Sequence, residues 1–192
     1  MGVVTATSHR RDDVIVREGP FTRAERDALP DDGYRHELLD GVLLMTPSPV
    51  TRHQDIVGRL FILLTQHAPK SAKVLVAPFD VVLGEGTVLE PDVVVARRGD
   101  VTDKNLPGPP LLAIEVLSPA TRLFDLARKK GLLEEAGCPS YWVVDPAGPE
   151  LIAWERDAGG RYVEVARVGQ GESWTAALPF AVMVTPAELL DD

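Results

Sequence analysis

The sequence predicts a domain of the α/β (α+β) class, built around a mixed β-sheet with helices beside it. Three observations support this: a helical pattern over residues 51–67, apolar runs of strand length between residues 73 and 117, and a second helical pattern after them. The elements follow the order helix, hairpin, helix, strands, helix, strand and a β-rich C-terminal tail. This order lacks the regular alternation of a doubly wound fold.

The first predicted elements are a short helix and a β-hairpin. Thr22 and Glu25 form a capping-box pattern that opens the helix, and Pro30 ends it. Residues 35–46 are predicted to form two strands joined at Asp40-Gly41. An Asp-Gly pair between apolar runs is a strong hairpin signal, because both turn residues must accept a positive φ.

The middle of the chain is predicted to contain one helix followed by strands. The helix over residues 51–67 has one apolar stripe, made of Ile56, Leu60, Leu63 and Leu64. Two β-rich runs, residues 73–83 and 87–96, are typical of strands buried in a sheet. A polar, proline-rich loop over residues 97–110 separates them from a strand over residues 111–117.

The C-terminal third begins with a helix over about residues 121–136, which Gly137 ends. A strand over residues 140–144 follows. Weaker strands are predicted near residues 150–155 and 161–168. We therefore expect a β-rich tail to complete the domain.

The 192-residue length fits a single domain over residues 20–185, between a polar segment at 1–19 and an acidic end at 186–192. Hydrophobic residues at 45% and charged residues at 26% exclude a disordered chain. Cys138 is the only cysteine, which excludes an intramolecular disulfide and a cysteine-cluster zinc site. With no signal-like segment and no membrane-length apolar run, we expect a soluble cytoplasmic protein.

The charge pattern bears on nucleic-acid binding in two opposite ways. A net charge of −9 argues against it, because affinity for the phosphate backbone rests on Lys and Arg. Between Glu115 and Gly131 the balance reverses. The cations there, which could form a local positive surface, are Arg122, Arg128, Lys129 and Lys130.

Three acids lie in apolar segments: Glu37, Asp92 and Glu115. A carboxylate in a buried strand must be paired, hydrogen-bonded or bound to a metal, and no basic residue adjoins Asp92 or Glu115 in sequence. Carboxylates on neighbouring strands can share a divalent cation, which polarises a phosphoryl oxygen and makes its bound water more acidic. The alternative is structural: Asp92 caps the turn after Pro91, and Glu115 pairs with an arginine.

Several strings resemble the Uma-type family of putative restriction endonucleases, in the PD-(D/E)XK nuclease superfamily. The resemblance covers roughly residues 20–185 and rests on six ordered motifs at residues 37–41, 48–54, 77–83, 90–92, 115–119 and 141–146. It implies a restriction-endonuclease-like fold, with a central mixed sheet flanked by helices and an N-terminal β-hairpin. It also implies phosphodiester hydrolysis with Mg²⁺ or Mn²⁺ held by Asp92, Glu115 and the Val116 carbonyl.

The position of the active-site lysine departs from the superfamily pattern, in which a Lys stands two residues after the Glu. Leu117 occupies that position here. The Uma-type pattern instead places the Lys on the next helix, four residues after an Asp, which matches Asp125 and Lys129. The family's tyrosine one turn later is Leu133. A regular helical wheel puts Lys130 in the apolar arc and Lys129 at its edge, so the choice between them stays open, with the family pattern favouring Lys129.

Two further residues are candidate auxiliaries. Glu37 is predicted to face inward with Leu39, where it could hold a water or second metal, or pair with Arg35 or a helix N-terminus. His53 lies one turn before Ile56 and also faces inward, either as a hydrogen-bonded core residue or as part of the site.

Two functions remain open from the sequence. The first is a metal-dependent endonuclease acting on nucleic acid, with DNA as the expected substrate, as a homodimer that cuts both strands. The second is a non-catalytic module for protein association or nucleic-acid binding. Asp92, Glu115 and Lys129 favour the first, while Leu117 and the acidic charge favour the second. The candidate catalytic residues are Asp92, Glu115, Lys129 and Glu37. Candidate nucleic-acid contacts are Arg122, Arg128 and Lys130.

Overall fold

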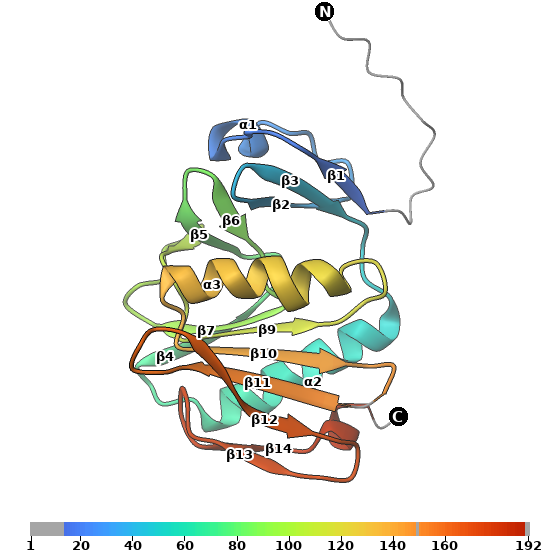
Figure 1. The fold of residues 1–192 in the computed structure, drawn as a ribbon, viewed down its shortest axis with the longest axis vertical. Helices are drawn as coiled ribbons and strands as arrows, with labels where there is room; N and C mark the ends of the chain where they lie inside the picture. Colours follow the sequence, from blue (N-terminus) through green and yellow to red (C-terminus); the bar gives the residue numbers. More distant parts are fainter. Residues whose placement is uncertain (1–13, 149, 191–192) are drawn as a thin grey trace, which may run out of the picture.

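The computed structural model describes residues 14–148 and 150–190. They form two six-stranded sheets and a two-stranded ribbon, with two long helices against one of the sheets (Figure 1). The predicted class, a mixed sheet flanked by helices, is confirmed. Residues 1–13 of the predicted polar segment and residues 191–192 of the predicted acidic end lie outside the described residues.

The first sheet contains the predicted hairpin. Its strand order is β1-β3-β2-β6-β5-β8, and its strands are β1 (Ile15–Arg17), β2 (Arg35–Leu39), β3 (Val42–Thr46), β5 (Asp80–Gly84), β6 (Thr87–Leu89) and β8 (Asn105–Pro107). The hairpin turn has φ of 52° at Asp40 and 78° at Gly41, as the Asp-Gly pair predicts. Helix α1 (Arg23–Asp27) begins with the predicted capping box between Thr22 and Glu25.

The second sheet is the central one, with the order β12-β11-β10-β9-β7-β4. Its strands are β4 (Ala72–Val76), β7 (Val93–Arg97), β9 (Leu112–Val116), β10 (Ser140–Asp145), β11 (Glu150–Arg156) and β12 (Tyr162–Val168). Strands β9 and β10 are parallel and the other pairs are antiparallel, so the sheet is mixed.

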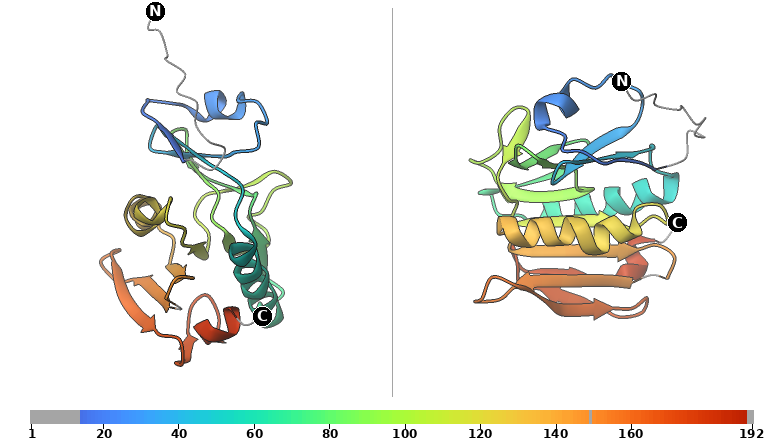
Figure 2. Two further views of the ribbon diagram at one scale, coloured as in Figure 1. Left: turned by 90° about the vertical axis from the view of Figure 1, so that its right-hand side faces the viewer. Right: turned by 45° about the horizontal axis from the view of Figure 1, so that its top comes forward.

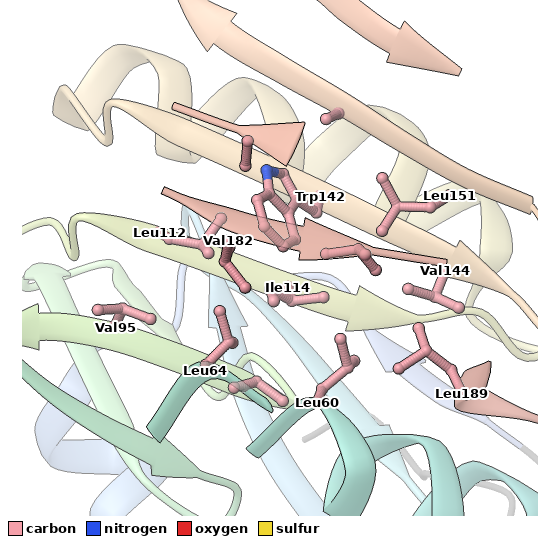
Figure 3. Packing of buried hydrophobic residues seen from close by; sticks show 14 of the residues in the cluster. Leu60, Leu64, Val95, Leu112, Ile114, Trp142, Val144, Leu151, Val182 and Leu189 are labelled. Atoms are coloured by element: carbon pink, nitrogen blue, oxygen red, sulfur yellow. The ribbon is translucent and has the colours of Figure 1, made fainter. Parts of the chain in front are cut away.

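Helices cover both faces of this central sheet. Helix α2 (Thr51–His67) lies on one face and α3 (Lys130–Ala136) on the other, as the left view of Figure 2 shows. On the α2 face, Leu60 and Leu64 pack with Ile114 and Trp142 (Figure 3). On the opposite face, Leu133 belongs to a second core cluster. The two faces are therefore fixed by the alternation of side chains along β9 and β10.

The C-terminal end closes the α2 side of the core. Strands β13 (Trp174–Ala176) and β14 (Val182–Val184) form the ribbon, and a 3-10 helix, η2 (Pro186–Leu189), follows. Leu189 is buried in the same core cluster as α2. None of the helices within the described ranges is long and apolar enough to cross a membrane.

The prediction of two continuous strands over residues 73–83 and 87–96 is wrong. Each run breaks, at Pro78 and at Pro91, and its two halves join different sheets: β4 and β7 the central sheet, β5 and β6 the first. A proline has no N–H to give to a strand ladder, so pairing stops where each proline lies. The predicted loop over 97–110 likewise contains a strand, β8, which pairs with β5. As a result Asp92 lies where the two sheets meet.

The helix predicted over residues 121–136 is present but not regular. Its first part is a π-helix, η1 (Phe124–Lys129), which continues into α3 and ends at Gly137 with φ of 91°. A π-helix has i→i+5 hydrogen bonds and turns less per residue than an α-helix, so a regular helical wheel places its side chains wrongly. Lys129 is fully buried, whereas Lys130 is only half-buried.

Candidate active site

The candidate site lies between the two sheets, where β7 and β9 run side by side. Val93 pairs with Ile114 in the antiparallel register, which places Asp92 and Glu115 next to each other across the two strands. Asp92 Oδ2 accepts a hydrogen bond of 2.8 Å from the Val116 backbone N–H. Both predicted carboxylates are therefore buried on neighbouring strands, as expected.

Lys129 holds three carboxylates together. Its Nζ lies 2.8 Å from Glu37 Oε2, 3.1 Å from Glu115 Oε1 and 3.2 Å from Asp125 Oδ1. The contact with Glu115 is a hydrogen bond, and the contacts with Glu37 and Asp125 are ion pairs. Glu37 also accepts a hydrogen bond of 2.8 Å from the Glu90 backbone N–H. The structure thus brings Lys129, and not Lys130, to Glu115.

Burial and charge pull the pKa values of this cluster in opposite directions. Burial by itself would lower the pKa of Lys129, but Glu115, Glu37 and Asp125 outweigh it and raise that pKa well above its usual value. Burial raises the pKa of Glu115 well above its usual value; Lys129 opposes the rise, and repulsion from Asp125 and Asp92 adds to it. Lys129 is therefore charged, whereas the charge of Lys129 only partly offsets the cost of burying the Glu115 carboxylate.

Asp92 has its own set of donors. Arg35 Nη1 lies 2.9 Å from Asp92 Oδ1, and His53 Nε2 lies 3.0 Å from Oδ2. Burial would raise the pKa of Asp92, but the His53 hydrogen bond and the charge of Arg35 outweigh it and hold that pKa below its usual value. No base adjoins Asp92 in sequence, but Arg35 reaches it from the neighbouring sheet. Arg35 does not take the partner considered for it, Glu37.

Two cavities meet at Asp92. One of about 660 Å³ and one of about 500 Å³ are both lined by Arg35, His53 and Asp92. Glu115 and Val116 line only the smaller one. Glu37, Asp125 and Lys129 line neither, so they support the site from behind.

The donor set fits a hard divalent cation. The four clustered carboxylates exceed the two cations Lys129 and Arg35 by two formal charges, His53 left aside. Across residues 14–148 and 150–190, no cluster of three or more His, Cys, Asp and Glu side chains has the arrangement of a metal site. A Mg²⁺-type ion needs no such cage, because it binds through one or two carboxylates and keeps several waters. Asp92 and Glu115 are the pair that line a common cavity.

The predicted positive surface over residues 122–130 is not one patch. Arg122 pairs with Asp145 at 2.5 Å, Arg128 reaches Asp40 at 3.3 Å, and Lys130 Nζ lies 4.6 Å from the Trp154 ring centroid. Lys129 is buried and contributes nothing to the surface. Of the four cations, Arg122 alone lines one of the two cavities described above.

Sequence reasoning missed four arginines at these cavities: Arg23 and Arg26 line the larger one, Arg52 lines the smaller one, and Arg35 lines both. Arg35 stands two residues before Glu37 on β2, and a period of two puts both side chains on one face. That spacing could have indicated from the sequence that Arg35 faces the same side as Glu37. Arg52 is exposed at the start of α2 and lines the smaller cavity, but the sequence around it carries no comparable signal.

Comparison with known proteins bears on the family and the fold of this chain. The family model Uma2, described as a putative restriction endonuclease, matches residues 23–187. The crystal structure of a putative nuclease belonging to DUF820, from Anabaena variabilis ATCC 29413, has a similar fold: the TM-score is 0.73 at 16% identity, over 89% of this chain and 98% of that one. Among curated proteins, no sequence matches this chain.

Proposed function

Because this chain belongs to the Uma2 family of putative restriction endonucleases, we propose that it is a divalent-metal-dependent endonuclease that hydrolyses phosphodiester bonds, with DNA as the expected substrate. The observation that carries the proposal is the pair Asp92 and Glu115, adjacent across β7 and β9 and lining one cavity. A homodimer, with one site for each strand of a duplex, is part of the same proposal.

The residues divide into ligands and supports. Asp92, Glu115 and the Val116 carbonyl would hold Mg²⁺ or Mn²⁺, which supplies polarisation of a phosphoryl oxygen and a more acidic water. Lys129 positions Glu115, and it is itself held by Glu37 and Asp125. His53 fixes the Asp92 carboxylate through its Nε2. Such supporting contacts commonly matter nearly as much as the ligands.

A nuclease assay tests the proposal directly. Plasmid, single-stranded DNA and RNA are incubated with Mg²⁺, with Mn²⁺ and with a chelator, in parallel with calorimetric titration of each metal. We expect metal-dependent cleavage by the wild type and none by Glu115→Gln. Nucleic-acid binding with neither cleavage nor metal uptake would instead support the non-catalytic module.

Nucleic-acid binding is expected to be weak and strongly salt-dependent, because the net charge of −9 repels phosphate and only a few local cations attract it. Arg52 and Arg122 line the smaller cavity, so replacing both with alanine should flatten the log–log salt slope by about 0.7–0.9 for each lost phosphate contact. The matched control replaces Arg128 and Lys130, which line neither cavity. An equal change of slope in the control would place the binding surface elsewhere.

A further inference from the structure

Arg35 is bound to the carboxylate of Asp92, one of the proposed metal ligands. Its Nη1 donates to Asp92 Oδ1 at 2.9 Å and to the Glu90 carbonyl at 3.3 Å, and its Nε donates to Thr46 Oγ1 at 3.4 Å. The side chain is 23% exposed. It forms part of the wall shared by the two cavities. Arg35 is therefore bound to the acidic cluster and also reachable from solvent on both sides.

The remaining contacts of Asp92 lie on its other oxygen. Its Oδ2 accepts from the Val116 N–H and faces His53, so Oδ1 is the oxygen that Arg35 covers. The other carboxylates near Arg35, Glu37 and Glu115, also attract its charge. Two cations on one carboxylate repel each other strongly at such distances. A divalent ion at Asp92 must therefore compete with the guanidinium.

We propose that Arg35 is an internal counter-cation that competes with divalent metal at Asp92 and is released to a phosphate of the nucleic acid, so that metal and substrate bind cooperatively. This inference rests on the proposed function. It adds that the metal and the nucleic acid each raise the affinity for the other, which does not follow from two metal-binding carboxylates alone.

The chemistry of the released side chain favours a phosphate as its second partner. A guanidinium presents a planar fork of N–H donors that matches two phosphate oxygens. From the shared wall it reaches both cavities that flank Asp92. Linkage then requires reciprocity: a nucleic acid that draws Arg35 away raises metal affinity by the same factor by which metal raises nucleic-acid affinity.

The test is calorimetric titration of Mn²⁺ into the full chain, with and without a phosphorothioate oligonucleotide that resists hydrolysis. The variants are Arg35→Met, Arg35→Gln and Arg35→Lys. The matched control is Arg98→Met, since Arg98 donates to the carbonyls of Lys70 and Ala72 at the other end of β4 from the site. Circular dichroism checks that each variant is folded. Two neutral variants are used so that the test remains possible if one of them does not fold.

Without oligonucleotide, we expect both neutral variants to bind Mn²⁺ about ten-fold more tightly than the wild type, or better, which corresponds to ~1.4 kcal/mol. Arg35→Lys keeps the charge and should stay near the wild type, as should Arg98→Met. The oligonucleotide should tighten Mn²⁺ binding to the wild type but not to the neutral variants.

Two outcomes overturn the inference, and they are distinguishable. If Mn²⁺ binds to the wild type and both neutral variants bind it no more tightly, Arg35 is not a competitor and the metal site stands. If Mn²⁺ binds to none of the proteins, with or without oligonucleotide, the metal-dependent function fails and this coupling fails with it.

Discussion

Lys129→Met is expected to lower the free energy of unfolding by about 3–5 kcal/mol, the usual cost of removing one partner from a buried ion pair. The ammonium is fully buried and contacts Glu37, Glu115 and Asp125, which would be left facing one another. Part of this cost is offset if Glu115, whose pKa is already raised by burial, takes up a proton. Urea denaturation without metal measures the change.

Cleavage by Lys129→Met should fall by about 10²-fold or more, because Glu115 loses the group that positions it. Metal binding should persist, since removing a cation leaves the cluster more negative. The matched control is Lys130→Met, which loses a contact with the Trp154 ring and should cost at most about 1 kcal/mol. Single-turnover cleavage at saturating Mn²⁺, below the melting temperature of both variants, compares them. Equal losses in the two would show that the buried lysine has no special part in the site.

Asp92→Asn is expected to lower stability and Glu115→Gln to hold or raise it, while both remove metal binding and cleavage. From the sequence, neutral isosteres at either position would hold or raise stability without metal. The structure separates them. Asp92 has a lowered pKa because His53 and Arg35 stabilise its charge, so its ionised form contributes stability above its ordinary pKa, and the Asn variant loses that contribution.

The expected cost of Asp92→Asn is roughly 2–3 kcal/mol, because Arg35 loses its carboxylate partner. Burial raises the pKa of Glu115, which means that burial penalises its charged form, and Gln relieves that penalty. Lys129 keeps Glu37 and Asp125 as partners in that variant. We therefore expect Glu115→Gln to match or exceed the wild type in melting temperature.

Thermal and urea unfolding without metal give the two stabilities, and Mn²⁺ calorimetry gives the two affinities. Wild-type protein should gain melting temperature with millimolar Mn²⁺ by mass action, and neither variant should. An Asp92→Asn variant as stable as the wild type would mean that its ion pair with Arg35 contributes little. A clear loss of stability in Glu115→Gln would mean that its charge is well compensated after all.

Local elements of this fold were readable from the sequence because short-range interactions determine them. Helix α2 spans residues 51–67 as its apolar stripe predicts, and the hairpin turns at Asp40 and Gly41, where positive φ is required. The capping box at Thr22 depends on contacts three residues apart. Asp92 and Glu115 were identified because a carboxylate in an apolar strand is costly wherever that strand lies.

Long-range structure decided the rest. Pro78 marks where the run over residues 73–83 can break, but which sheet each half joins depends on partners far away in the sequence. The choice of Lys129 over Lys130 follows from a π-helical start that a regular wheel does not contain. Arg35 reaches Asp92 across 57 positions of sequence, because two sheets meet there. The sequence by itself thus determined which residues carry charge into the core, and only the tertiary structure determined which of those charges meet.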